Sequence, residues 1–105
     1  MLRQNIIFVE NKAGSLKRVT GLLSENEVNI FGFACLDTPE FAIFRMVADQ
    51  PEKAEKILTE NGYMNRIADV IAVDLEDKVG SLDELLAAAA DSNISLNYIY
   101  TSFHR

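Results

Sequence analysis

Apolar and polar residues alternate in this chain with two different periods, and each change of period marks an expected element. Two short runs, residues 6–10 and 70–75, consist mainly of β-branched and other apolar side chains, as strands prefer. Each run leads through a polar loop into a stretch with apolar residues at helical spacing: Leu16, Val19, Leu22 and Leu23 in the first, Leu82, Leu85 and Leu86 in the second. The runs NIFGFACL and ISLNYIYTSF then predict a further strand in each case.

This order of strand, loop, helix and strand is a repeat. Residues 9–36 align without a gap on residues 75–102, and the two loops read ENKAGSL at 10–16 and EDKVGSL at 76–82. Chance readily supplies a shared Gly-Ser-Leu triplet, but it rarely supplies the same apolar run before it and the same amphipathic stretch after it. The chain therefore contains a duplicated structural unit, of which the loop is one part.

Only the first copy continues beyond its second strand. A turn is expected at residues 37–40, a strand at Phe41–Ala48, and a second helix with Pro51 in its first turn and Gly62 past its end. A short strand at residues 64–67 completes the unit. The order β-α-β-β-α-β packs as a ferredoxin-like, four-stranded antiparallel sheet with both helices on one face, so we predict the α+β class.

We predict two domains of unequal completeness. Residues 1–69 hold the complete unit, and residues 70–105 hold a β-α-β half. Strands at 70–75 and 96–103 then lack the element between them, which leaves backbone N–H and C=O groups unpaired. We expect another chain to complete this half in a homodimer or higher oligomer; direct pairing of the two strands and fraying of the end are the alternatives. Ile6 and Phe8, apolar on the sheet face without helices, also favour an oligomer.

Composition restricts the class of partner. Sixteen acidic and ten basic residues give a net charge of -6, which argues against binding to nucleic acid. The apolar stretches are too short to cross a bilayer, and the N-terminal residues lack the pattern of a signal peptide. A single cysteine, Cys35, cannot form an internal disulfide. We expect a cytoplasmic protein without a membrane segment.

The β-α-β-β-α-β order, the Asn/Asp-Lys-x-Gly-Ser-Leu loop and the Val-Asn-Ile pattern that opens the next strand resemble the ACT domain family. The resemblance is to small stand-alone proteins with two ACT domains in tandem, from which this chain departs by its incomplete second domain. It implies a non-catalytic regulatory protein that binds a free amino acid, or a similar carboxylated metabolite, at an interface between ACT domains. It also implies self-association and no cofactor.

The chemistry of the paired loops is compatible with an amino acid. Gly14 and Gly80 allow positive φ and a close approach of backbone to a ligand, and the helix that follows favours a carboxylate. Asn11 and Asp77 can accept hydrogen bonds from an α-ammonium group. The candidate ligand-binding residues are Asn11, Lys12, Ala13, Gly14, Ser15, Leu16, Asp77, Val79, Gly80, Ser81 and Leu82.

A purely structural role for these loops is the alternative. Ser15 and Ser81 are expected to cap the two helices, and Ser81 with Glu84 three residues later matches a capping box. A strand-to-helix turn of this composition needs no ligand. The protein would then be an interaction or oligomerisation module, associated with copies of itself or with a metabolic enzyme.

No pattern typical of an enzyme is present in the sequence. It contains no nucleophile with a neighbouring base, no cluster of metal ligands and no phosphate-binding glycine loop. Cys35 is expected as a small buried residue in a strand, and His104 as a solvated residue next to the last position. We therefore predict that the protein is not an enzyme and holds no metal.

Overall fold

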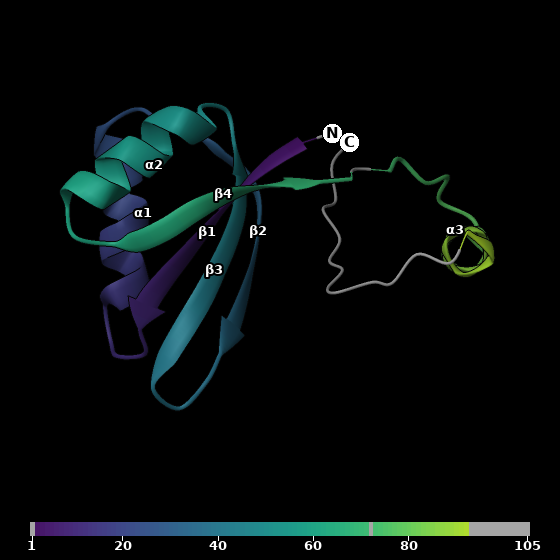
Figure 1. Cartoon of the computed structure of the whole chain (residues 1–105), viewed down its shortest axis with the longest axis horizontal. Coiled ribbons are helices and arrows are strands. Elements are labelled where there is room, and N and C mark those ends of the chain that lie inside the picture. The colour runs from purple at the N-terminus through teal and green to yellow at the C-terminus, as the bar shows by residue number, and fades with distance from the viewer. Residues whose placement is uncertain (1, 72, 93–105) are drawn as a thin grey trace. The chain divides into compact units, whose positions relative to one another are not determined.

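A four-stranded antiparallel sheet dominates the first part of the chain (Figure 1). The computed structural model describes residues 2–71 and 73–92, and the chain divides into two compact units, residues 1–71 and 72–105. The elements of the first unit are β1 (Leu2–Glu10), α1 (Ser15–Glu25), β2 (Ile30–Asp37), β3 (Phe41–Ala48), α2 (Pro51–Glu60) and β4 (Met64–Val70). The sheet order is β2-β3-β1-β4. The predicted α+β class with an antiparallel sheet is confirmed.

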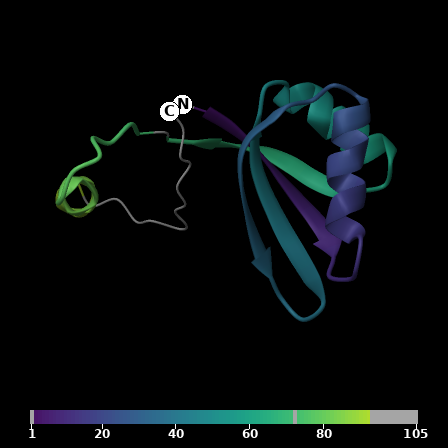
Figure 2. The ribbon, with the colours of Figure 1, turned by 180° about the vertical axis from the view of Figure 1, so that it is seen from behind.

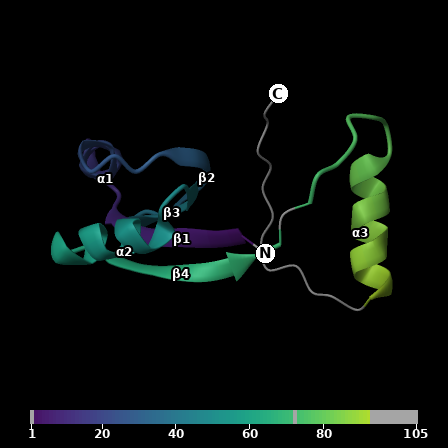
Figure 3. The same cartoon turned by 90° about the horizontal axis from the view of Figure 1, so that it is seen from above.

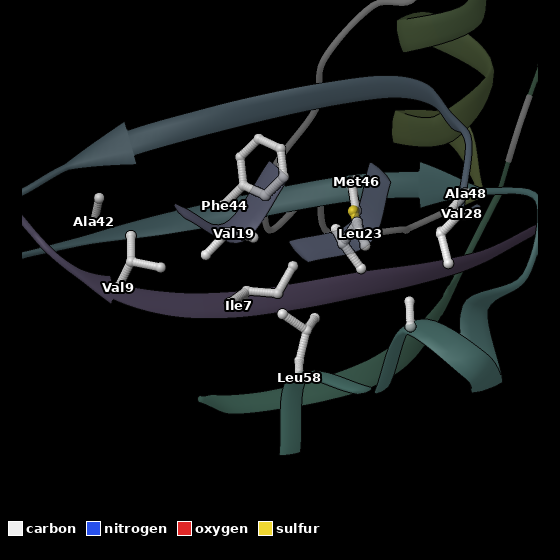
Figure 4. Close-up of a cluster of buried hydrophobic side chains, with 11 residues drawn as sticks. Ile7, Val9, Val19, Leu23, Val28, Ala42, Phe44, Met46, Ala48 and Leu58 are labelled. Carbon is white, nitrogen blue, oxygen red and sulfur yellow. The ribbon is translucent and has the colours of Figure 1, made fainter. Parts of the chain in front are cut away.

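Both helices of the first unit cover the same face of the sheet (Figure 2). Ile7 of β1 pairs with Phe44 of β3, so these two side chains point to the same side. On that side they meet Val19 of α1 and Leu58 of α2 in one buried cluster (Figure 4). Alternate residues of the two central strands thus form the floor of the core, and the helices form its cover.

Local signals set the ends of the second helix. Pro51 stands at its first position, where the missing N–H has no intrahelical partner to lose. Gly62 follows its end with φ of +86°, a conformation that residues with a Cβ rarely adopt. After this turn β4 runs antiparallel to β1, from the pair Phe8 and Met64 to the pair Leu2 and Val70 (Figure 3).

Ile6 was expected to be an exposed apolar residue on the open face of the sheet, and the structure shows otherwise. Ile6 lies on the face without helices, but it is only 2 % exposed. In the strand register it stands between Arg45 of β3 and Arg66 of β4. A central strand has neighbours on both sides, whose side chains shield it from solvent. Ile6 is therefore no evidence for an interface.

In the second unit, α3 (Ser81–Asp91) lies where the spacing of Leu82, Leu85 and Leu86 predicted a helix. The predicted strand at 70–75 is wrong beyond its first residue, because β4 ends at Val70 and residues 71 and 73–76 belong to no strand. A strand needs a neighbouring strand for its hydrogen bonds, and none pairs with this segment among the described residues. The strand expected at 96–103 lies outside the described residues.

Candidate functional site

Each of the two repeated loops ends in a glycine with left-handed backbone geometry. Gly14 has φ of +81° and Gly80 has φ of +93°, and each is the N-cap of the helix that follows it. A Cβ built on either glycine would meet nothing within 4 Å. Backbone conformation therefore requires the glycines, and the space beside them is open to solvent or to a ligand.

The two serines are not the N-caps that the sequence predicted. Ser15 and Ser81 are the first residues of α1 and α3, and no side chain caps either helix. Ser81 and Glu84 form no capping box, since the Glu84 N–H donates to the Gly80 carbonyl at 2.9 Å. The left-handed glycine takes the N-cap position, so the serine falls one residue too late for its hydroxyl to act as a cap.

Instead, the two hydroxyl groups are buried and unpaired. Ser15 is 7 % exposed and Ser81 is 8 % exposed. The Oγ atoms of both have no hydrogen-bond partner among the described residues. Buried polar atoms are normally paired, so the same unpaired atom at equivalent positions of both repeats requires an explanation.

The start of α1 also carries free backbone donors. The Ser15 N–H donates to the Lys12 carbonyl at 3.2 Å, and the Arg18 N–H donates to Gly14 at 3.0 Å. Between them, the N–H groups of Leu16 and Lys17 have no acceptor within the helix, as in any first turn. Together with the positive end of the helix dipole they favour an anion near the loop.

The lysines of the two loops repeat the same ion pair. The Lys12 Nζ lies 3.0 Å from the Glu10 Oε2, and the Lys78 Nζ lies 3.3 Å from the Glu76 Oε2. Both pairs are exposed, so their contribution to stability is small. They keep one positive and one negative charge beside each loop.

The amide and carboxylate at the equivalent positions 11 and 77 differ. Asn11 donates through Nδ2 to the Thr38 carbonyl at 2.7 Å, which leaves its Oδ1 as an acceptor. Asp77 is exposed, and its side chain has no hydrogen-bond partner in the part of the chain that the structure describes. Both positions thus offer an oxygen acceptor, but only Asn11 is tied to another element.

The remaining candidates divide into packed and exposed residues. Leu16 packs against the core cluster, so its burial serves the fold. Ala13 is exposed, Val79 is fully exposed, and Leu82 is 49 % exposed. The loop at residues 10–16 belongs to the first unit and the loop at residues 76–82 to the second. The structure therefore brings candidates together only within the same loop.

Two open hollows occur near these elements. One, of about 290 Å³, lies within the second unit, and its lining includes the candidate Ser81. The other, of about 420 Å³, lies between α1 and the turn from α2 to β4, and it contains none of the candidates. Its lining residues are Lys17, Arg18, Gly21, Leu22, Glu25, Asn61 and Tyr63. Sequence analysis missed it because residues from two distant segments form it.

Cys35 is exposed, in contrast to the buried position expected from the sequence. It lies on β2, one of the two edge strands of the sheet. Partial burial and the carboxylate of Asp37 both raise the pKa of the Cys35 thiol, so the reactive thiolate is scarce at neutral pH. The described residues contain no group of three or more potential metal-ligating side chains.

Comparison with known proteins supports the relationship indicated by the loops. The chain resembles the crystal structure of protein BT0572 from Bacteroides thetaiotaomicron, with 28 % identity and a TM-score of 0.93 over 98 % of this chain and 72 % of that chain. No curated protein matches it. No helix in the described residues has the length and apolar character to cross a membrane. The model of the ACT domain pair matches residues 1–104, and the chain therefore belongs to the ACT domain pair family.

Proposed function

We propose that this protein is a non-catalytic regulator that binds a free amino acid, or a similar carboxylated metabolite, at an interface between ACT domains. In this proposal residues 1–69 form a complete ACT domain and residues 70–105 a partial one. ACT domains are generally regulatory and often bind ligands. The observation that carries the proposal is the buried, unpaired hydroxyl beside a left-handed glycine in both loops.

The chemistry assigns each end of an amino acid to a part of the loop. The carboxylate accepts hydrogen bonds from the first-turn N–H groups and from the Ser15 or Ser81 hydroxyl. The α-ammonium group donates to the Asn11 Oδ1 or to the Asp77 carboxylate. A ligand of this class pairs the buried hydroxyl and balances its own two charges within one loop.

Thermal melting against the twenty common L-amino acids tests the proposal. A ligand present at about 100 times its dissociation constant adds about 2.7 kcal/mol to the free energy of unfolding. We expect one amino acid, or a chemically related group, to raise the melting temperature. The corresponding amines without a carboxylate are the matched control and should have no effect. If the whole panel is without effect, the proposal is wrong.

A second candidate function rests on the edge strand β2. Its large apolar residues Phe31, Phe33 and Leu36 are each more than 60 % exposed. An exposed apolar edge strand is typical of a surface that pairs with another chain. An oligomerisation module, bound to itself or to a metabolic enzyme, would explain this surface without any small ligand. Self-association together with a negative amino-acid panel would favour it.

A further inference from the structure

The side chain of Asn11 connects the first loop to the turn between β2 and β3. Its Nδ2 donates to the Thr38 carbonyl at 2.7 Å, and its backbone N–H donates to the Glu40 carbonyl at a longer 3.4 Å. The residues it joins are 27 positions apart in the sequence. The loop at the start of α1 therefore has a second attachment besides its own strand and helix.

The turn is built so that the Thr38 carbonyl is free to accept this bond. In a tight turn the N–H of the fourth residue commonly donates to the carbonyl of the first. Here the Phe41 N–H donates to the Thr38 hydroxyl at 3.1 Å, and the same hydroxyl donates to the Phe41 carbonyl at 2.7 Å. The Thr38 N–H also donates to the Phe41 carbonyl, at 2.8 Å. The Thr38 hydroxyl oxygen thus accepts the Phe41 N–H in place of the Thr38 carbonyl oxygen, which stays free to accept from Asn11.

Thr38, whose carbonyl accepts the bond from Asn11, is itself hydrogen-bonded to Phe41, and Phe41 belongs to the sheet. Phe41 pairs with Glu10 in the register of β1 and β3, and its ring lies 6.4 Å from that of Phe8 between centroids. Pro39, with its fixed φ, stands inside the turn. The sheet therefore restricts the position of Thr38, and the bond to its carbonyl restricts the position of Asn11 in the loop.

Within residues 73–92, which the structure describes, the second loop has no equivalent contact. Asp77, the repeat equivalent of Asn11, has only acceptor oxygens when it is ionised and is unable to donate to a carbonyl. Only an amide at this position can both hold the loop and leave one oxygen free for a ligand.

We propose that Asn11 is a positioning residue, which through Thr38 holds the first loop ready for its ligand and makes it the tighter of the two sites. This inference rests on the proposed amino-acid binding. A site that is ordered before binding loses less conformational entropy when the ligand binds. The second loop lacks this contact among the described residues, so we expect ligand binding there to lose more conformational entropy.

The test compares Asn11→Asp with Asn61→Asp. Both remove an amide donor from a short bond to a carbonyl, since the Asn61 Nδ2 donates to Ile57 at 2.8 Å at the end of α2. Hydrogen exchange of the ligand-free protein reports loop order at residues 12–16. Calorimetric titration with the amino acid that most raises the melting temperature reports affinity. We expect Asn11→Asp to speed exchange and weaken binding, each about fivefold, the equivalent of one hydrogen bond.

The possible outcomes separate the two proposals. If Asn61→Asp weakens binding as much as Asn11→Asp, a general loss of stability explains the effect and the inference is wrong. Faster exchange in Asn11→Asp with unchanged affinity would reduce Asn11 to a structural role. Unchanged exchange would show that the contact does not order the loop. A negative amino-acid panel would instead refute the proposed function, and with it the ligand-related part of this inference.

Discussion

At the scale of single residues, the position of one glycine decides the role of the serine beside it. Gly14 takes the N-cap of α1 in a left-handed conformation, so Ser15 enters the helix and points into a buried environment. A serine one residue earlier would cap the helix with its hydroxyl. The unpaired Oγ is therefore a consequence of backbone geometry.

Removing the Ser15 or Ser81 hydroxyl should have opposite effects on the stability of the protein and on its affinity for an amino acid. We expect Ser15→Ala and Ser81→Ala to raise the free energy of unfolding by up to about 1 kcal/mol, because a buried unpaired hydroxyl is unfavourable. Each variant should also weaken amino-acid binding about fivefold. Ser24→Ala, an exposed position of the same helix α1, is the control for both effects. Urea unfolding and calorimetric titration measure the two quantities, and loss of stability without loss of affinity would contradict the assignment.

Substituting alanine for Gly14 or for Gly21 should change stability in opposite directions, because only Gly14 has a positive φ. Gly14→Ala should lower the free energy of unfolding by about 1–2 kcal/mol, because alanine is unfavourable at φ of +81° even though its Cβ has open space. Gly21→Ala, inside α1 and with ordinary contact to the Lys17 side chain, should raise it by about 0.5–1 kcal/mol. Urea unfolding of both variants checks the opposite signs. Equal effects would mean that backbone conformation is not the cause.

At the scale of elements, α2 is attached to the sheet by its buried face and by its first residue. Leu58 is fully buried in the core cluster, and Ala54 lies one turn before it on the same face. Near the other end, the Asn5 Nδ2 of β1 donates to the Pro51 carbonyl at 3.0 Å. The helix is thus fixed to the central strand along its length.

Substitutions on α2 should follow this arrangement. We expect Leu58→Ala to lower the free energy of unfolding by about 2–5 kcal/mol, because it leaves a cavity in the core. Ile57→Ala, at a partly buried position next to it, should have a smaller effect. Guanidinium unfolding of the two variants measures the difference. Equal losses would show that the helix packs differently from the structure.

At the scale of the whole molecule, the two units differ in what they can bury. The core cluster lies entirely between Ile7 and Leu58, within the first unit. In the described part of the second unit, Ser81 is the one buried residue. A single helix of this length is marginal in water without packing. The first unit therefore has the means to fold by itself, whereas the second is expected to depend on contacts with other surfaces.

This difference predicts the behaviour of fragments and of the intact chain. We expect residues 1–71 to unfold cooperatively by circular dichroism, and the full chain to sediment as a homodimer or higher oligomer at micromolar concentration. If another chain completes the second unit, the fragment should lose part or all of this association. A full chain that sediments as a stable monomer would contradict the prediction.

Features that depend on neighbouring residues were predictable from the sequence by itself. The apolar pattern predicted β3 with its observed bounds and a helix at the position of α3, and Pro51 and Gly62 marked the ends of α2. The repeated loops led to the family and to the left-handed glycines. All these signals lie within a few residues of the structure they determine, because they act through backbone conformation and side-chain period.

Tertiary structure alone decided the features that need a distant partner. Residues 71 and 73–75 have the composition of a strand, but a strand forms only beside another strand. Cys35 is exposed on β2, which is one of the two edge strands, and strand order is a property of the whole fold. The bond from Asn11 to Thr38 depends on a turn that the sheet brings to the loop. No local pattern contains this information, because the contacts join segments that only folding brings together.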